Sequence, residues 1–133
     1  MIIKTSDTLF GAFTEQSWSS NNVYKSDSNA FIFSLVNRLN KPVKMKWTQN
    51  KGIGCFKEFG PIFGGGLKGY PSDICIFDNS NKNLSSLTNL GHSYAHANYA
   101  FESNEAKSFL AGTYKFKVLD IEIFTASKIV KLE

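Results

Sequence analysis

A chain of 133 residues, of which 42% are hydrophobic and 20% charged, has the size and composition of a single globular domain and is too apolar to be disordered. No stretch approaches the roughly 18 consecutive apolar residues of a membrane span, and the first residues lack the pattern of a secretory signal. The formal net charge of +4 comes from scattered lysines and one arginine, Arg38, so a nucleic-acid-binding module is only a minor alternative. We therefore expect a cytoplasmic protein, with the nucleus as a second compartment.

The first third of the chain has the patterns of antiparallel strands. Residues 2–14 contain two short β-type runs on either side of Ser6-Asp7, which has the composition of a hairpin turn. Residues 17–29 are rich in Ser and Asn and are expected to form a polar loop. The apolar run at residues 30–37, AFIFSLVN, predicts a buried central strand. Residues 43–47 alternate apolar and cationic side chains, so their apolar members should share one buried face.

Glycines separate two further predicted strands. Residues 53–59, IGCFKEF, and residues 73–77, DICIF, flank a run that contains three consecutive glycines. The segment that follows, residues 79–89, is mostly polar and is expected to be a surface loop. The repeated change between strand-like and polar segments is typical of an antiparallel sandwich.

One helix and one long strand are predicted near the C-terminus. Residues 105–112 form the best helical candidate, with Ser103 or Asn104 as its cap and Gly112 as its end. Residues 114–124 alternate as a strand, and the break of phase at Leu119-Asp120 suggests a bulge. The expected fold is therefore mainly β: a two-sheet antiparallel β-sandwich with one or two short helices.

The glycine run invites comparison with a phosphate-binding loop. Gly64, Gly65 and Gly66 are followed by Leu67-Lys68, but then by Tyr70-Pro71 and a strand, whereas a P-loop continues into a helix. No helix N-terminus is therefore available to hold a phosphate. We expect these glycines to permit positive φ and close backbone approach at a turn between the sheets.

The histidines, the cysteines and one serine are the other candidates for chemistry. His92 and His96 have HxxxH spacing, but on a strand they would lie about 13 Å apart, too far to share a metal ion. The sequence Gly91–Ala95 is a degenerate GxSxG elbow, but His96 follows the serine by only three residues and the chain is too short for a hydrolase of that fold. Cys55 and Cys75 form no CxxC pair and are expected to be reduced and buried. We expect no catalytic set, no metal site and no cofactor.

Several segments, taken in order, resemble the TLDc domain family. They are LFGAFTEQSW at residues 9–18, AFIFSL at 30–35, GPIFGGG at 60–66, DICIFDNSN at 73–81, SLTNLGHSY at 86–94 and SFLAGTYKFKVLDIEIF at 108–124. The resemblance covers residues 1 to about 125, which makes residues 1–133 a single TLDc-like domain. After the third glycine the chain is more similar to protist and fungal members than to animal ones. In the family a first strand and a helical segment precede the position of Ile2, so we expect the N-terminal part of the domain to be missing.

The resemblance implies a β-sandwich of two antiparallel sheets with short helices at its ends. Proteins of this family are associated with protection against oxidative stress, and several bind the vacuolar proton pump, the V-ATPase. No accepted catalytic mechanism accompanies the domain. The positions that we expect to be structural members of the shared motifs are Gly11, Gly64, Gly65, Gly66, Asp73, Gly91, His92, Gly112 and Glu122.

Two functions of different classes follow. The favoured hypothesis is a non-enzymatic module that binds a protein partner, such as a peripheral V-ATPase subunit, through loops at one end of the sandwich. The alternative is a small thiol- or peroxide-reactive enzyme that uses Cys55 or Cys75. Such an enzyme needs an exposed cysteine whose pKa is lowered by a nearby cation.

Overall fold

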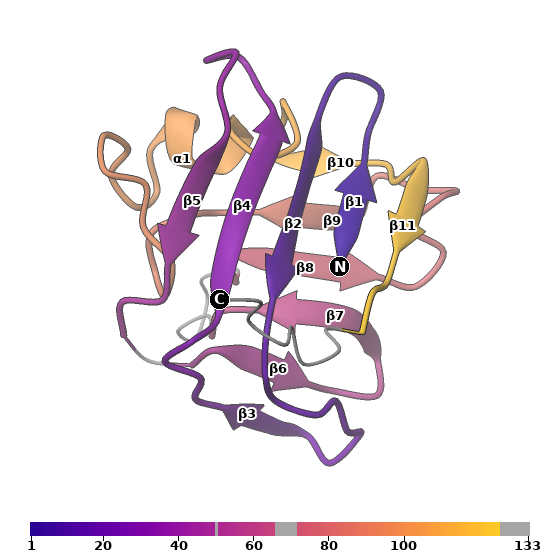
Figure 1. Cartoon of the computed structure of the whole chain (residues 1–133). Coiled ribbons are helices and arrows are strands. Elements are labelled where there is room, and N and C mark those ends of the chain that lie inside the picture. The colour runs from indigo at the N-terminus through magenta and orange to yellow at the C-terminus, as the bar shows by residue number, and fades with distance from the viewer. Residues whose placement is uncertain (50, 66–71, 126–133) are drawn as a thin grey trace, which may run out of the picture.

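The computed structural model describes residues 1–49, 51–65 and 72–125. These residues form eleven strands and one short helix, and the strands build two antiparallel sheets of five and six strands (Figure 1). The elements are β1 Ile2–Lys4, β2 Leu9–Phe13, β3 Val23–Lys25, β4 Phe31–Val36, β5 Val43–Lys46, β6 Ile53–Cys55, β7 Phe59–Phe63, β8 Ile74–Phe77, β9 Ser86–Thr88, α1 Asn104–Ser108, β10 Lys115–Phe116 and β11 Asp120–Glu122. The predicted mainly β architecture with two antiparallel sheets is confirmed.

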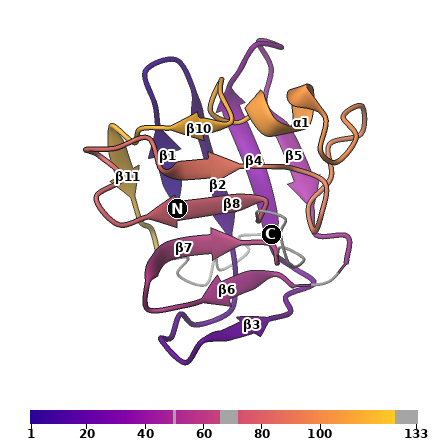
Figure 2. The same cartoon turned by 180° about the vertical axis from the view of Figure 1, so that it is seen from behind.

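The two sheets pack face to face, and their strands cross at a steep angle, as the front and rear views show (Figure 1 and Figure 2). Apolar side chains from both sheets fill the space between them. Phe10 of β2 and Phe116 of β10 meet edge to face across the layers, with ring centroids 5.6 Å apart. The most deeply buried core side chains include Ile3, Phe10, Ile32 and Met45 from one sheet and Ile53, Phe63, Ile74 and Ile76 from the other.

The five-stranded sheet has the order β11-β1-β2-β4-β5. The predicted hairpin joins β1 to β2, and the side chain of Thr5 accepts the backbone N–H of Thr8 at 3.1 Å within the turn. In β5 the predicted alternation is confirmed, because Met45 is buried while Lys44 and Lys46 are exposed.

Strand β4 is central, as predicted, but it is not buried on both faces. Ile32 and Ser34 point into the core, whereas Phe31 and Phe33 are partly exposed and Leu35 is 41% exposed. The continuous apolar run at residues 30–37 therefore does not require that both faces of β4 are buried. In the described residues, only one of its two faces is covered by the second sheet.

The six-stranded sheet has the order β10-β9-β8-β7-β6-β3 and differs from the sequence prediction at three strands. The single strand expected at residues 53–59 is wrong, because β6 ends at Cys55 and a separate strand, β7, begins at Phe59. Strand β3 lies inside the segment expected to be a polar loop, and it pairs with β6 through the register Tyr24 to Gly54. Strand β9 lies inside the segment expected to be a surface loop, yet Ser86 and Thr88 are fully buried. Strands β3 and β9 are short and contain polar side chains. Pairing with neighbouring strands places them in the sheet, and their own residue pattern does not predict it.

The phase break at Leu119-Asp120 is not a bulge but a change of sheet. Phe116 pairs with Ser86 in the six-stranded sheet, whereas Ile121 pairs with Ile3 in the five-stranded sheet. At the crossing point the backbone N–H of Leu119 donates to the carbonyl of Lys4 at 2.8 Å. The predicted single strand is therefore two strands, β10 and β11, that tie the layers together.

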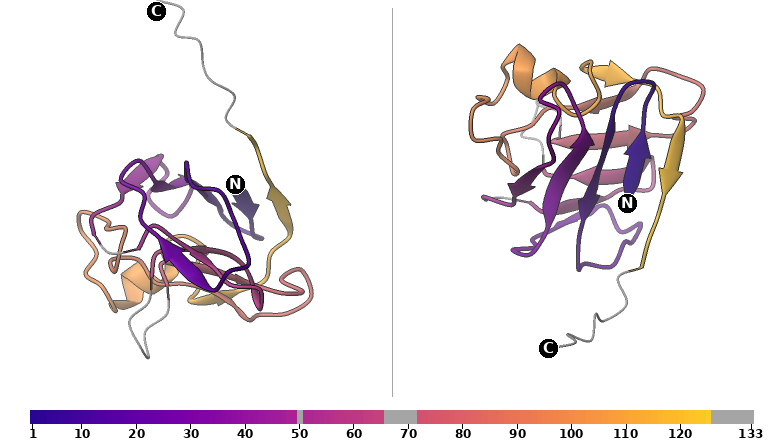
Figure 3. Two further views of the ribbon diagram at one scale, coloured as in Figure 1. Left: turned by 90° about the horizontal axis from the view of Figure 1, so that it is seen from below. Right: turned by 45° about the horizontal axis from the view of Figure 1, so that its top comes forward.

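Helix α1 lies at one end of the sandwich (Figure 3). Ser103 is its N-cap, as predicted, and its hydroxyl accepts the backbone N–H of Ala106 at 3.1 Å. The helix ends at Ser108, earlier than expected, and Phe109 and Leu110 turn into the core. Gly112 has a φ of +86° and donates its backbone N–H to the carbonyl of Ser108, which closes the segment.

Candidate functional site

Asp73 lies directly before β8 and is completely buried. Its carboxylate accepts backbone N–H groups from a turn that follows β9. Oδ2 accepts from Gly91 at 3.0 Å and from Tyr94 at 3.1 Å, and Oδ1 accepts from Ser93 at 3.0 Å. We call Asp73 and these three amides the Asp73 nest.

Two opposing effects act on the Asp73 carboxyl. Burial raises its pKa to about 7, even though the amides of Tyr94, Ser93 and Gly91 favour the charged form. Desolvation dominates because the nest supplies partial charges but no full positive charge. Asp73 is therefore a buried acid that titrates near neutral pH.

Gly64 leaves the space that Asp73 occupies. Gly64 has a φ of +81°, and a Cβ at this position would overlap the Oδ1 atom of Asp73. The Gly64 backbone N–H donates to the carbonyl of Gly52 at 2.8 Å, which holds the end of β7 against the segment before β6. The expected positive φ and close approach are confirmed at this position.

The glycine run joins neighbouring strands of one sheet and not the two sheets. Strands β7 and β8, on either side of it, both belong to the six-stranded sheet, so the predicted turn between the sheets is wrong. Gly65 donates its backbone N–H to the Oγ atom of Ser93 at 3.3 Å. Gly66 lies outside the described residues. Gly64 and Gly65 therefore bring the backbone close to the buried carboxylate of Asp73 and the buried side chain of Ser93.

The turn around the Asp73 nest also holds the segment between β5 and β6. The Tyr94 side chain is fully buried, and its hydroxyl donates to the carbonyl of Gly52 at 2.7 Å. The backbone N–H of Thr48 donates to the carbonyl of Ser93 at 2.8 Å, and Trp47 forms a β-bridge with Tyr94. Three chain segments therefore meet at the Asp73 nest: the turn at residues 91–94, the segment between β5 and β6, and the end of β7.

Gly91 meets two demands at once within the nest. Its φ is +113°, which favours glycine, and a Cβ would lie 2.9 Å from the backbone Cα atom of Phe101. The structure therefore explains why a glycine occupies this motif position. Tyr94 and Ser93 lie in the same quoted motif, SLTNLGHSY, although the sequence patterns did not single out Tyr94.

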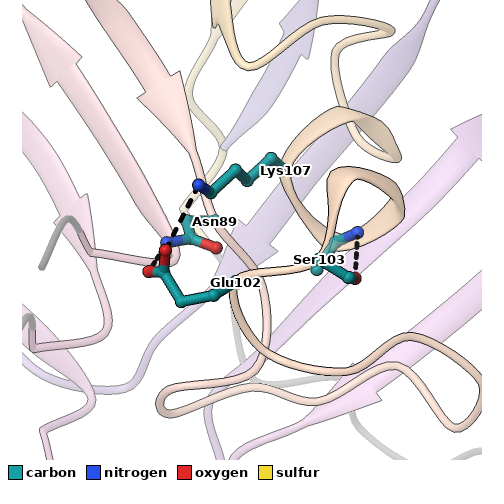
Figure 4. Close-up of polar contacts among 5 residues, drawn as sticks. Asn89, Glu102, Ser103 and Lys107 are labelled. Atoms are coloured by element: carbon teal, nitrogen blue, oxygen red, sulfur yellow. Dashed lines mark hydrogen bonds and ion pairs between the residues drawn. The ribbon is translucent and has the colours of Figure 1, made fainter.

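Asn89 connects the Asp73 nest to helix α1. Its backbone N–H donates to the carbonyl of Asp73 at 3.0 Å, and its side-chain amide donates to Glu102 at 2.6 Å. Glu102 also forms an ion pair with Lys107 of α1 at 3.2 Å (Figure 4). The hydrogen bond from Asn89, and then the ion pair with Lys107, hold the pKa of Glu102 below its usual range. Sequence reasoning missed Asn89 and its contact with Glu102.

The two histidines lie in separate aromatic surroundings. His92 packs near Phe101, and its Nδ1 atom lies 3.3 Å from the Oγ atom of Ser93. His96 stacks on Tyr99 with ring centroids 4.1 Å apart, and burial lowers the pKa of both histidines. Within the described parts of the chain, no group of three His, Cys, Asp or Glu side chains could hold a metal ion.

The arrangement does not resemble a serine nucleophile. The Ser93 side chain is 0% exposed, so a substrate has no access to its hydroxyl. Asp73 directs its carboxylate oxygens to backbone amides, whereas a catalytic acid would orient a histidine. The sequence Gly91–Ala95 is thus a structural turn.

Both cysteines are buried, free thiols. Burial raises the pKa of the Cys75 thiol to about 12, so Cys75 is protonated at neutral pH. Cys55 is 1% exposed and lines a pocket of about 280 Å³ near the β6–β7 turn. Trp18, Phe56 and Ile123 also line this pocket.

The remaining motif positions lie away from the Asp73 nest. Gly11 is in β2, where the ring of Phe33 would overlap any Cβ. Gly112 follows α1, and Glu122 is in the edge strand β11. The structure therefore brings together Gly64, Gly65, Asp73, Gly91 and His92, and it separates them from Gly11, Gly112 and Glu122.

Of the helices in the described residues, none is long and apolar enough to cross a membrane.

Comparisons with known proteins agree with this reading of the motifs. The model of the TLDc domain family matches residues 1–127. No curated protein and no solved structure matches the chain. Since the family match extends over nearly the whole sequence, the chain belongs to the TLDc domain family.

Proposed function

We propose that this domain is a non-catalytic protein-interaction module whose binding surface is formed by the loops around the Asp73 nest. The observation that carries the proposal is the buried carboxylate of Asp73, which fixes the turn at residues 91–94 through three backbone amides. Exposed residues, including Gln49 and Lys51, lie on the segment that this turn holds. Loops fixed before binding lose little conformational entropy when a partner docks.

The partner that we propose is a peripheral subunit of the V-ATPase, and the proposed role is protection against oxidative stress in the cytoplasm. The support is membership of the TLDc domain family together with the resemblance of its motifs. The exposed Lys51 places a positive charge on the proposed surface, which suits an acidic patch on the partner.

The test is direct binding of the purified chain to the isolated peripheral sector of the V-ATPase, measured by biolayer interferometry. We expect Lys51→Glu to weaken binding by about tenfold, which corresponds to about 1.4 kcal/mol. Lys57→Glu is the matched control, because Lys57 is an exposed lysine in the β6–β7 turn, away from the Asp73 nest. Absence of binding by the unaltered chain, or equal loss in both variants, would count against the proposal.

The pocket beside Cys55 favours the alternative function, a thiol-dependent enzyme that consumes peroxide. This alternative depends on Cys55, since Cys75 is held protonated by burial. Peroxide consumption by the purified chain separates the two functions. We expect none above the rate of a Cys55→Ser variant, and turnover that disappears in that variant would replace the interaction module with an enzyme.

A further inference from the structure

The outer face of the five-stranded sheet carries a row of five residues whose chemistry is ordered across the strands. The backbone register places Ile2 opposite both Glu122 and Gly11, and it then aligns Gly11 with Phe33 and Phe33 with Lys44. Their sequence neighbours Ile3, Phe10 and Ile32 are buried in the core, so the row faces away from the second sheet. From edge to edge the row reads Glu122, Ile2, Gly11, Phe33, Lys44.

Aromatic rings lie beside this row, and one of them is covered by the lysine at its end. Phe13 and Phe31 are cross-strand neighbours with ring centroids 5.3 Å apart, and Phe31 lies 6.1 Å from Phe33. The ammonium group of Lys44 lies 4.1 Å above the centre of the Phe31 ring. No ribbon of the described residues crosses this face (Figure 1). Within the described residues, the face therefore has an apolar centre that no backbone segment of the second sheet covers.

The two edges of the face carry opposite charges. Glu122 and Asp120 lie on β11, although Lys4 is the cross-strand neighbour of Asp120 and offsets part of its charge. Lys44 and Lys46 lie on β5, at the other edge. A partner that matches the whole face must therefore be basic on one side, apolar in the middle and acidic on the other.

A second copy of the same chain meets this requirement. A two-fold axis that runs parallel to the strands above β2 places Glu122 of one copy opposite Lys44 of the other. The same rotation places Ile2 opposite Phe33, and Gly11 opposite itself on the axis. A two-fold axis across the strands would instead place Glu122 opposite Glu122, which is repulsive. The row is thus complementary to itself in one of the two orientations that an isologous pair could take.

We propose that two copies of this chain associate face to face through the outer surface of the five-stranded sheet, about a two-fold axis parallel to the strands. Five strands span only about 20 Å, so the contact is smaller than a standard stable interface and the dimer is weak and concentration-dependent. The loops of the Asp73 nest belong to the end of the six-stranded sheet and stay free. The association is therefore independent of the proposed partner binding.

The experiment is sedimentation equilibrium of the purified chain over a series from low micromolar to submillimolar concentration. We expect a monomer–dimer equilibrium. Lys44→Glu and Glu122→Lys should each raise the dissociation constant by about tenfold or more, because each variant brings like charges together at both ends of the row. An equimolar mixture of the two variants should restore the dimer, because both contacts then pair opposite charges again.

Lys57→Glu is the control with the same change of charge at a site outside this face, and it should leave the dimer unchanged. Thermal unfolding of each variant verifies that these exposed substitutions preserve the fold. A monomer at all concentrations overturns the proposal. A dimer that the charge reversals do not weaken, or that the mixture does not restore, belongs to another surface and also overturns it.

Discussion

At the scale of single residues, Asp73 has the largest influence on the proposed site. A buried carboxyl is normally unfavourable in its charged form, and burial therefore shifts the pKa of Asp73 towards neutrality. Its hydrogen bonds to Gly91, Ser93 and Tyr94 compensate the carboxylate in part. The same contacts fix a turn of the backbone, so the position of a loop depends on one ionisable side chain.

The raised pKa of Asp73 predicts a stability that depends on pH. An acid whose pKa is higher in the folded than in the unfolded protein binds protons more strongly when folded, so its contribution is complete below pH 3.8 and is lost as the pH rises to about 7. Since each pKa unit corresponds to about 1.4 kcal/mol, the free energy of unfolding should fall by up to roughly 4 kcal/mol over this range. Urea unfolding at a series of pH values measures it.

An Asp73→Asn variant isolates this contribution from that of other titrating groups. The amide imitates the protonated carboxyl and cannot ionise. We expect the stability of the unaltered chain, relative to the variant, to decrease from pH 4 to pH 7.5. A constant difference, or one that grows with pH, would show that the backbone amides outweigh burial.

Gly64 and Gly112 form a matched pair for testing close approach. Both have positive φ, +81° and +86°, so alanine at either position is strained by roughly 1–2 kcal/mol. Only at Gly64 does a Cβ overlap a buried side chain; at Gly112 the nearest atom is Thr8 Cγ2 at 3.8 Å. Chemical unfolding should show a clearly larger loss for Gly64→Ala than for Gly112→Ala. Equal losses would mean that strain alone explains the glycine run.

At the scale of elements, helix α1 is too short to be stable by itself. Its five residues depend on the Ser103 cap, on the ion pair between Lys107 and Glu102, and on Arg38, whose side chain donates to the Ser108 hydroxyl at 3.1 Å. These contacts join the helix to the β4–β5 turn and to the end of β9. The element is therefore stabilised from outside its own sequence.

Removal of the Ser103 cap tests this dependence. Ser103→Ala should lower the free energy of unfolding by about 1 kcal/mol, because the backbone N–H of Ala106 loses its acceptor. Ser103→Asp keeps an acceptor at the same position and should restore most of the loss. Thermal unfolding followed by circular dichroism measures both. If the aspartate variant is as unstable as the alanine variant, the serine does not act as a cap.

At the scale of the whole molecule, two crossed sheets share one core. Strands β10 and β11 follow one another in sequence but belong to different sheets, and Phe10 contacts Phe116 across the layers. The described part of the chain therefore has no sheet that could lose its core without affecting the other. We expect the sheets to unfold together in one transition.

Truncation of Phe10 tests the shared core. Phe10→Ala should lower the free energy of unfolding by about 3–5 kcal/mol, a large part of the total for a domain of this size. Leu84→Ala is the matched control, because Leu84 is 65% exposed and its loss should change stability by less than about 0.5 kcal/mol. Tryptophan fluorescence and far-ultraviolet circular dichroism should give the same midpoint for Phe10→Ala. Two separate transitions would contradict a single core.

Much of the fold can be predicted from the sequence, because the alternation of apolar and polar side chains indicates which face of a strand is buried. The alternation of β5 identified Met45 as buried and its flanking lysines as exposed, and Ser6-Asp7 marked the hairpin. Strands β3 and β9 escaped detection because they are three residues long and contain polar side chains. Their places in the sheet depend on hydrogen bonds to strands that are distant in sequence.

Some residues of the candidate site were likewise predicted from the sequence, whereas others were found only in the structure. Gly64, Asp73 and Gly91 were expected to be structural members of shared motifs, and the residues after the glycine run did not match a phosphate-binding loop. Their convergence, and the contributions of Tyr94 and Asn89, depend on contacts between segments that are distant in sequence, such as the hydrogen bond from the Tyr94 hydroxyl to the carbonyl of Gly52, 42 residues away. The periodicity of apolar and polar residues along the sequence does not predict such contacts.

The sequence by itself determined the class of fold, the family and most strands, because these follow from local alternation, turn residues and motif order. Only the tertiary structure decided which sheet each strand joins, that the break at Leu119-Asp120 is a crossing between layers, and that the Asp73 carboxylate fixes the turn at residues 91–94. The physical reason is that pairing and desolvation are properties of segments brought together in space. A buried acid such as Asp73 acquires its pKa and its hydrogen bonds only from neighbours that the folded chain supplies.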